Sequence, residues 1–155
     1  MRNVLRVVLV LGGLAGSAAC GGPRGAAPAG GHAEEGAPAL YDRIGGRDAL
    51  LAIVDDFVAI VVADPRINAR FAAADLPAFK AKLVDQLCEQ SGGPCKYTGR
   101  SMRDAHVGMR VQEAELAAFV DDLGRSLAKL EVPEREQAEL RALLAAMHDD
   151  IVAAP

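Results

Sequence analysis

The chain of 155 residues contains no tryptophan, two tyrosines and four phenylalanines, so aromatic side chains make up only 4% of it. This scarcity argues against a protein that binds single-stranded nucleic acid, because such proteins stack bases on aromatic rings. Asp and Glu outnumber Lys and Arg by 21 to 17. The negative net charge also argues against nucleic acid or an anionic membrane surface as the partner.

Histidine and cysteine are equally scarce, with three of each. They do not form the closely spaced sets of ligands that a zinc site requires. Cys88 and Cys95 lie seven residues apart, on either side of the turn Ser91-Gly92-Gly93-Pro94. In an oxidising compartment they could close a disulfide, and the alternative is two separate buried thiols.

The first twenty residues, MRNVLRVVLVLGGLAGSAAC, read as an export signal with a basic start, a short apolar run and small residues at its end. The apolar part is short for a membrane span, which needs about 20 residues. The small-residue run ends at Cys20, and this ending resembles a bacterial lipoprotein signal. The resemblance implies that Cys20 carries lipid and anchors the chain to a membrane; the alternative is plain cleavage and a periplasmic protein.

Residues 21–38 are mostly Gly, Ala and Pro, which predicts a flexible tether because such a segment has little apolar surface to bury. The folded domain is then expected over residues 39–155. Residues 1–20 contain two arginines and no acid, so the rest of the chain has 15 basic and 21 acidic residues and a net charge of −6.

Apolar residues recur at three- and four-residue spacing through this domain, which predicts an all-α fold. Helices are expected over Tyr41–Ile44, from Asp48 to Asp64, from Pro77 to Gly92, over Leu116–Leu130 and from Pro133 to Ile151. Proline and glycine limit most of them. The second helix is expected to bury Leu50, Leu51, Val54, Phe57, Val58 and Val61, and the last one Leu140, Leu143, Leu144, Met147 and Ile151.

Four segments, LYDRIGG, VDDF, DPRINARF and GGPCKYTGRSMRDAHVGM, occur in an order and spacing that resemble the group I truncated haemoglobins. The resemblance extends from Leu40 to about Val152. It implies a two-over-two helical sandwich around haem b, iron protoporphyrin IX, with O2, NO or CO as further ligands.

The same resemblance gives roles to individual residues. It implies that His106 is the proximal ligand of the haem iron, and one axial imidazole leaves the opposite position open for a gas. Phe71 would wedge the porphyrin, and Lys82 would reach a propionate. Tyr97 and Met102 would line the proximal side, and Phe57 and Phe119 would lie near the distal side.

The distal side departs from the family pattern. Its members usually carry tyrosine after the phenylalanine of the second helix, where this chain has Val58. The partner positions on the third helix are Phe79 and Leu83, which donate no hydrogen bond either. Gln86 lies one turn from Leu83 and could turn inward, although the narrow apolar stripe predicts that it faces elsewhere. A donor to a charged acceptor contributes about 1.5–3 kcal/mol, so its absence predicts an O2 dissociation constant raised roughly ten- to a hundredfold.

Three functions remain open at this stage. The first is reversible binding of diatomic gases by an exported haem protein. The second is a haem enzyme, an NO dioxygenase or a peroxidase; the former needs a reductase, and the chain carries no flavin or nicotinamide motif. The third is a globin fold that has lost haem, which the retention of His106 and Phe71 argues against.

Overall fold

The computed structural model of the protein describes residues 37–152, which belong to one compact unit, Gly36–Pro155. The predicted export signal, Cys20 and nearly all of the tether lie outside the described residues. The described residues form helices and no strand, as the periodicity predicts. None of their helices is both long enough and apolar enough to cross a membrane.

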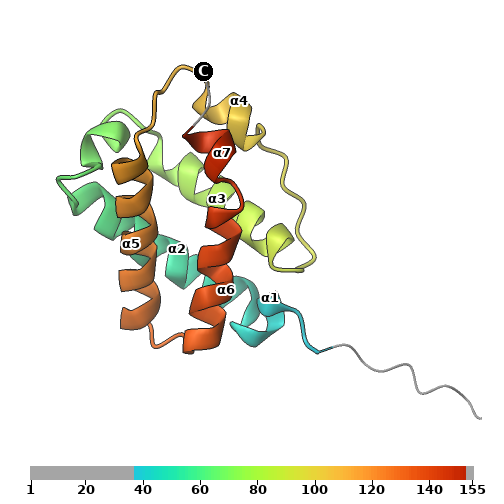
Figure 1. Cartoon of the computed structure of the whole chain (residues 1–155). Coiled ribbons are helices and arrows are strands. Elements are labelled where there is room, and N and C mark those ends of the chain that lie inside the picture. Colours follow the sequence, from blue (N-terminus) through green and yellow to red (C-terminus); the bar gives the residue numbers. More distant parts are fainter. Residues whose placement is uncertain (1–36, 153–155) are drawn as a thin grey trace, which may run out of the picture. The chain divides into compact units, whose positions relative to one another are not determined.

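The elements follow one another along the chain as shown in Figure 1. They are α1 (Leu40–Arg43), α2 (Gly46–Ala63), the 3-10 helix η1 (Asn68–Phe71), α3 (Leu76–Gln90), α4 (Met102–His106), α5 (Glu113–Lys129), α6 (Glu134–Ala145) and α7 (His148–Ile151). Helix α2 packs against both α3 and α5, and α5 packs against α6. Two helix pairs, α2–α3 and α5–α6, therefore form two layers.

Glycine sets the start of α2 two residues earlier than expected. Gly45 and Gly46 have φ values of 100° and 71°, a left-handed backbone that favours glycine. The helix ends at Ala63, before Asp64 and Pro65, as predicted. The sharp entry turns α1 back against α2.

Helix α3 begins with a side-chain cap, because the carboxylate of Asp75 accepts a hydrogen bond from the backbone N–H of Ala78 at 3.0 Å. Pro77 lies in its first turn, as expected. After the helix, a Cβ at Gly93 would lie 2.6 Å from the ring of Tyr41, so no larger residue fits there without a shift. This close contact holds the end of α3 against α1.

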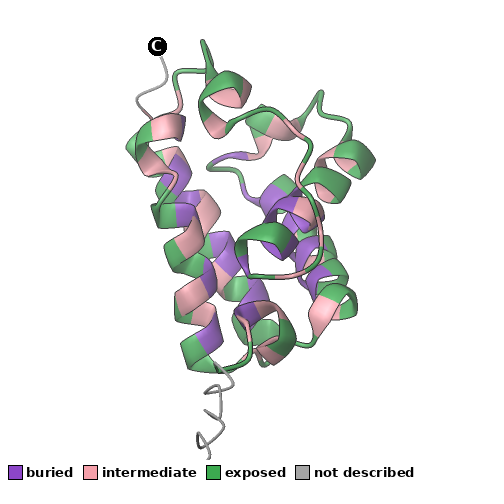
Figure 2. Ribbon diagram, turned by 90° about the vertical axis from the view of Figure 1, so that its right-hand side faces the viewer, coloured by how far each residue is buried: buried purple, intermediate pink, exposed green. Residues whose placement is uncertain are grey.

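The core lies between the two layers and is formed mainly by aliphatic side chains from α2, α3 and α5 (Figure 2). The prediction that Leu51 belongs to the core is wrong, because Leu51 is 43% exposed. Ile53 is buried on the inner face of α2 instead. The apolar run around Leu51 fits two neighbouring helical faces, so spacing alone did not separate them.

The prediction of one continuous helix from Pro133 to Ile151 is also wrong. It breaks after Ala145, and Met147 has φ −99° and ψ 2° before α7 begins. Contacts across the fold accompany the break: Arg103 of α4 pairs with Asp150 at 3.0 Å, and His148 Nε2 lies 2.9 Å from a carboxylate oxygen of Glu113. Helix α7 therefore lies against α4 instead of continuing α6.

A group of charged residues holds the turn between α2 and η1. Arg66 contacts Asp64, Asp121 and the fully buried Asp122. Hydrogen bonds from the Arg66 side chain and backbone lower the pKa of Asp64 to about 2, whereas burial raises the pKa of Asp122. The turn is thereby fixed to α5 a few residues before Phe71.

Candidate functional site

His106 is the last residue of α4, and its ring orientation is fixed by a hydrogen bond. Its Nδ1 atom lies 2.7 Å from the backbone carbonyl oxygen of Met102, one turn earlier. A carbonyl only accepts, so Nδ1 carries the proton and donates, and Nε2 keeps its lone pair. Among the described residues, Nδ1 is the ring atom of His106 that has a protein hydrogen-bond partner. The side chain is half-buried.

Helix α4 has five residues and is held at its start by Ser101. The backbone N–H of Asp104 donates to Ser101 Oγ at 3.1 Å, and Ser101 Oγ lies 2.7 Å from the Asp104 carboxylate. These bonds satisfy donors that a helix start otherwise leaves unpaired. The hydrogen bonds of Ser101 therefore stabilise the start of this short helix.

The extended segment before α4 is tied down by Tyr97. Its backbone N–H donates to Glu89 at 3.2 Å, and its hydroxyl donates to the carbonyl of Arg100 at 2.9 Å. A Cβ at Gly99 would lie 2.2 Å from the Tyr97 ring, so a larger residue there would have to displace this ring. Tyr97 and the half-buried Met102 lie in the segment expected to form the proximal side.

Cys88 and Cys95 form a disulfide, the first of the two alternatives that the sequence left open. Their Cα atoms lie 5.7 Å apart, and Cys88 is fully buried near the end of α3. Arg47 at the start of α2 approaches the sulfur of Cys95 at 3.4 Å. The bond thus ties α3 to the segment that leads to His106.

All four phenylalanines of the chain meet in one aromatic group. Phe57 and Phe119 pack edge to face with ring centroids 4.7 Å apart. Phe71 lies 5.5 Å from Phe79 and stacks on Phe119 at 6.2 Å. Residues from α2, η1, α3 and α5 are thereby brought together, and the roles expected for these phenylalanines beside a haem stay predictions.

The predicted distal positions are apolar in the fold as well as in the sequence. Val58 is 1% exposed and Leu83 is 7% exposed, while Phe79 is half-buried within the aromatic group. None of the three carries a hydrogen-bond donor on its side chain. A phenylalanine and two aliphatic side chains also exclude water from this part of the core.

Gln86 contacts the region where α6 and α7 meet. It is 7% exposed, and its amide nitrogen lies 3.1 Å from the sulfur of Met147. Gln86 is therefore buried beside Met147, and its turning toward the distal positions stays a prediction. A thioether is a weak acceptor, so this buried amide has a poor partner. The break between α6 and α7 places Met147 beside Gln86. No local sequence pattern predicts this contact.

Lys82 lies on the exposed surface of α3 and donates to Thr98 Oγ1 at 3.1 Å. Thr98 belongs to the segment between the disulfide and α4. The ammonium group is thus close to the chain that leads to His106, on the outer side of it. The expected role toward a propionate is compatible with this position.

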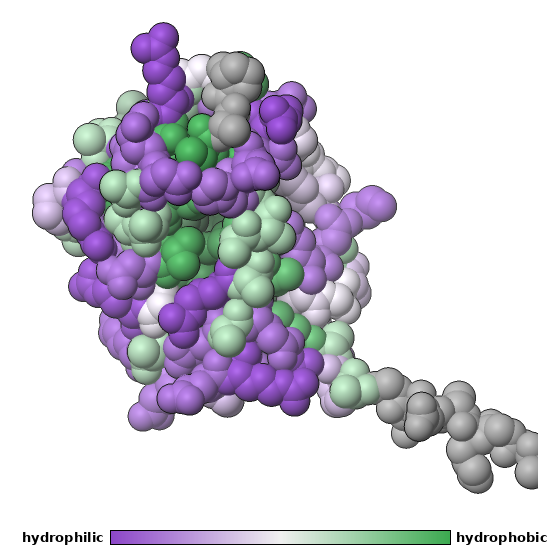
Figure 3. Space-filling view, viewed as in Figure 1, coloured by the Kyte–Doolittle hydropathy of each residue, from purple (hydrophilic) through white to green (hydrophobic). Residues whose placement is uncertain are grey.

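Exposed apolar side chains follow directly after α4. Val107 is 56% exposed and Met109 is 39% exposed. Figure 3 shows a group of apolar side chains between α5 and the helices α6 and α7, with polar and charged side chains around it. Phe71 also lines a hollow of about 400 Å³ with Val62, Asn68 and Leu76. A second hollow, of about 630 Å³, lies along α2 and α5 beside Arg66 and contains none of the predicted site residues.

Residues 39–153 match the family of bacterial-like globins. The chain belongs to this family. It is 30% identical over 112 residues to the group 1 truncated haemoglobin of Mycolicibacterium paratuberculosis, covering 72% of this chain and 82% of the relative. It is 34% identical to that of Synechocystis sp., covering 69% of this chain and 90% of the relative.

Solved structures agree with the sequence relatives. The truncated haemoglobin of Tetrahymena pyriformis superposes with a TM-score of 0.72 at 29% identity, covering 74% of this globin chain and 98% of that one. The 2/2 haemoglobin of Synechococcus sp., whose structure carries covalently attached haem, superposes with a TM-score of 0.70 at 26% identity, covering 75% and 99%. The protein has the fold of the truncated haemoglobins, and membership of the globin family implies that it binds haem.

The described residues fit such a group. His106 presents one imidazole nitrogen without a protein partner, which suits an iron held in a macrocycle. No set of three His, Cys, Asp or Glu side chains in residues 37–152 could hold a bare metal ion instead. The exposed Val107 and Met109 supply apolar surface that a planar apolar group can cover.

Sequence reasoning missed Arg70, which has more polar contacts than any predicted site residue. Its guanidinium contacts Glu115 and the backbone carbonyls of Met109 and Arg110. The segment quoted for the resemblance, DPRINARF, contains Arg70 beside Phe71. Its partners lie at least 39 residues away in the sequence, so only the fold reveals them.

Proposed function

We propose that this protein is a group I truncated haemoglobin that binds haem b through His106 and reversibly binds diatomic gases. A ferrous haem supplies an iron atom with one open axial position, at which O2, NO or CO can bind. The hydrogen bond between His106 Nδ1 and the Met102 carbonyl carries the proposal, because it leaves Nε2 free as the single ligand atom. Relatives at 30–34% identity named as group 1 truncated haemoglobins support it.

The remaining site residues would hold the macrocycle by contact. Phe71, stacked on Phe119, would pack on the porphyrin, and Met102 and Tyr97 would support the proximal side. Lys82 would turn from Thr98 toward a propionate, a change that a long, exposed side chain makes at little cost.

Gas binding is favoured over catalysis by the distal residues. Peroxidase chemistry needs an acid–base group near the reacting atoms, and Val58, Phe79 and Leu83 supply none. An NO dioxygenase needs a long-lived oxygen complex and a reductase as partner. Without a donor at these positions, O2 would leave quickly, while CO and NO would depend less on such a bond.

We further propose that the protein is exported and anchored through lipid on Cys20, or free in the periplasm if Cys20 is not modified. The small-residue run that ends at Cys20 supports the anchor. The Cys88–Cys95 disulfide supports an oxidising compartment, because such bonds are rare in the cytosol.

The visible spectrum of the reduced protein, with and without CO, tests the haem proposal. His106→Ala should abolish stoichiometric haem binding, or leave only weak and exchangeable haem. His148→Ala is the matched control, since His148 contacts Glu113 and Asp149 on the surface and should leave the spectrum unchanged. An unchanged iron–histidine Raman band in His106→Ala would contradict the assignment.

A further inference from the structure

Arg70 joins two segments that lie far apart in the sequence. Its Nε and Nη2 atoms donate to the two carboxylate oxygens of Glu115, both at 2.7 Å. Its Nη1 atom donates to the carbonyl oxygen of Met109 at 2.7 Å, and Nη2 also lies 3.4 Å from the carbonyl oxygen of Arg110. A paired, two-point contact of this kind fixes direction as well as distance.

These contacts lie next to the two residues that the proposed site relies on most. Arg70 immediately precedes Phe71 in η1. Met109 follows His106 by three residues, and its backbone N–H donates to the His106 carbonyl at 3.0 Å. One guanidinium therefore connects the chain beside Phe71 with the turn that ends the His106 helix.

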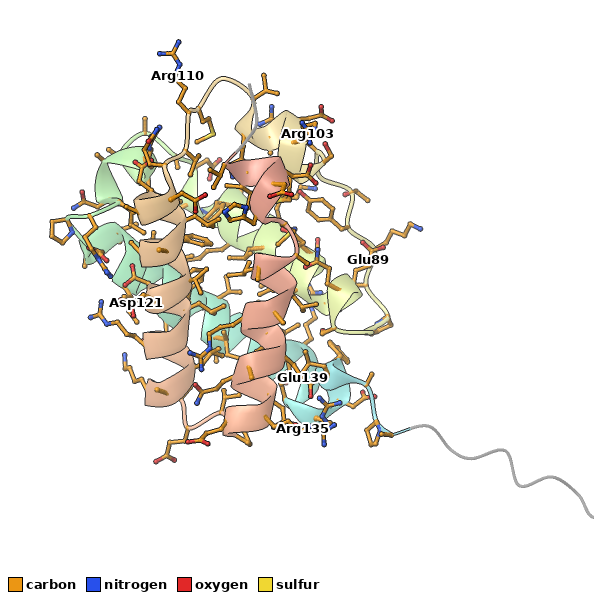
Figure 4. The ribbon with its side chains drawn as sticks, in the orientation of Figure 1. Glu89, Arg103, Arg110, Asp121, Arg135 and Glu139 are labelled. Carbon is orange, nitrogen blue, oxygen red and sulfur yellow. A yellow bond between two sulfur atoms is a disulfide. The ribbon has the colours of Figure 1, made fainter. Side chains whose placement is uncertain are left out.

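Gln112 also holds this turn, because its side-chain amide donates to the Arg110 carbonyl at 2.9 Å. Gly108 and Arg110 adopt positive φ values of 75° and 50°, and Val107 and Met109 are exposed. The Arg110 side chain projects away from the domain (Figure 4), while its carbonyl oxygen lies near Arg70. For a residue with a Cβ, this left-handed backbone is unfavourable and requires contacts that stabilise it.

Glu115 is well placed to keep the contact formed. Its carboxylate also accepts a hydrogen bond at 2.8 Å from the backbone N–H of Gln112, just before α5 begins. Hydrogen bonds from Arg70 and from Gln112 hold the pKa of Glu115 below its usual range. The carboxylate is therefore charged at neutral pH.

We propose that Arg70 is a positioning residue that clasps the Phe71 side of the haem site to the His106 side and so slows the escape of haem. This inference rests on the proposed haem function. It adds a specific role: the Arg70–Glu115–Met109 contact, called the clasp below, holds one edge of the site closed. Opening that edge would free η1 and the turn after α4 to move apart.

The rate of haem transfer to excess haem-free acceptor globin tests the clasp. Arg70→Met keeps an unbranched apolar stem and removes every donor. It should raise the rate about tenfold, equivalent to about 1.4 kcal/mol. Glu115→Gln, a conservative change that keeps the side-chain size, should raise it in the same direction by a smaller factor.

Arg43→Met is the matched control. Arg43 also joins two carboxylates, Glu136 and Glu139, but does so between α1 and α6. It should lower the urea midpoint of the haem-free chain, as Arg70→Met does, yet leave haem transfer within about twofold of wild type. A ratio of the two effects separates positioning at the site from general stability.

Two results would overturn the clasp. One is a wild-type transfer rate in both Arg70→Met and Glu115→Gln. The other is an equal acceleration in Arg43→Met, which would reduce the effect to general stability. If the wild-type protein takes up no stoichiometric haem, the proposed function itself fails and the clasp falls with it.

Discussion

At the scale of single residues, Val58 has the largest consequence for ligand choice. It is 1% exposed, and the resemblance to the group I truncated haemoglobins leads us to expect tyrosine at this position. With Phe79 and Leu83 it gives the proposed distal side no donor. The pocket would then bind O2 weakly relative to CO and NO, because those two gases gain less affinity from a hydrogen-bond donor.

Replacing Val58 with tyrosine restores a phenol at that position. The O2 dissociation rate should fall at least about tenfold, the effect of one hydrogen bond to a charged acceptor of about 1.5 kcal/mol. The CO dissociation rate should change much less. Stopped-flow measurement of both gases in both proteins gives the ratio that decides the point.

Val58→Leu controls for added bulk, because a larger side chain in a packed core slows ligand entry without donating a hydrogen bond. If wild-type O2 loss is already slow and the tyrosine leaves it unchanged, another donor acts in this pocket. Gln86, whose buried amide contacts only the weak acceptor Met147, would be the first to examine.

At the scale of elements, the disulfide turns the end of α3 and the segment after it into one unit. Cys88 is the last buried residue of α3, and Cys95 begins the extended chain toward Tyr97. The loop that it closes is short. A disulfide stabilises a protein mainly by restricting the unfolded chain, and a short loop limits the size of this effect.

Cys95→Ser should lower the free energy of unfolding by about 2.5 kcal/mol, the loop-closure estimate for a loop of this size. Chemical denaturation of the haem-free protein, with and without reductant, measures the loss. Reductant should lower the midpoint of the wild type and leave that of Cys95→Ser unchanged. A wild-type midpoint that does not respond to complete reduction would contradict a stabilising role.

The helices could be predicted from the sequence where proline and glycine limit them. Asp64-Pro65 ends α2, Pro77 lies in the first turn of α3, and Pro133 precedes α6. The break between α6 and α7 has no such marker. It accompanies pairs with α4 and α5, Arg103–Asp150 and His148–Glu113, which form only after the chain has folded.

The site was predictable in the same uneven way. The resemblance to a family predicted roles for His106 and Phe71 because both residues lie in characteristic local segments, and these roles stay predictions. It gave no account of the clasp or of the Gln86–Met147 contact, since each joins residues 39 or more positions apart. A contact between residues that are distant in the sequence produces no local sequence pattern from which it could be predicted.

At the scale of the whole molecule, the proposed anchor on Cys20 decides where the globin domain works. Labelled palmitate should enter the wild-type protein expressed in a bacterial host and should not enter Cys20→Ser. Attachment of the labelled lipid requires the thiol of Cys20, so replacement by serine, which has a similar size, is the appropriate control. Equal labelling of both proteins, or of neither, would leave export without lipid.

The two ends of the described domain lie at opposite poles. Helix α1, where the described chain enters the domain, packs against α2 and α6, while α4 with His106 lies beside α7 at the far pole (Figure 1). Helix α1 and the His106 helix α4 therefore offer two separate surfaces of the described domain. A molecule that approaches α4 and one that approaches α1 would not compete for the same surface, so the two ends of the domain can be occupied independently.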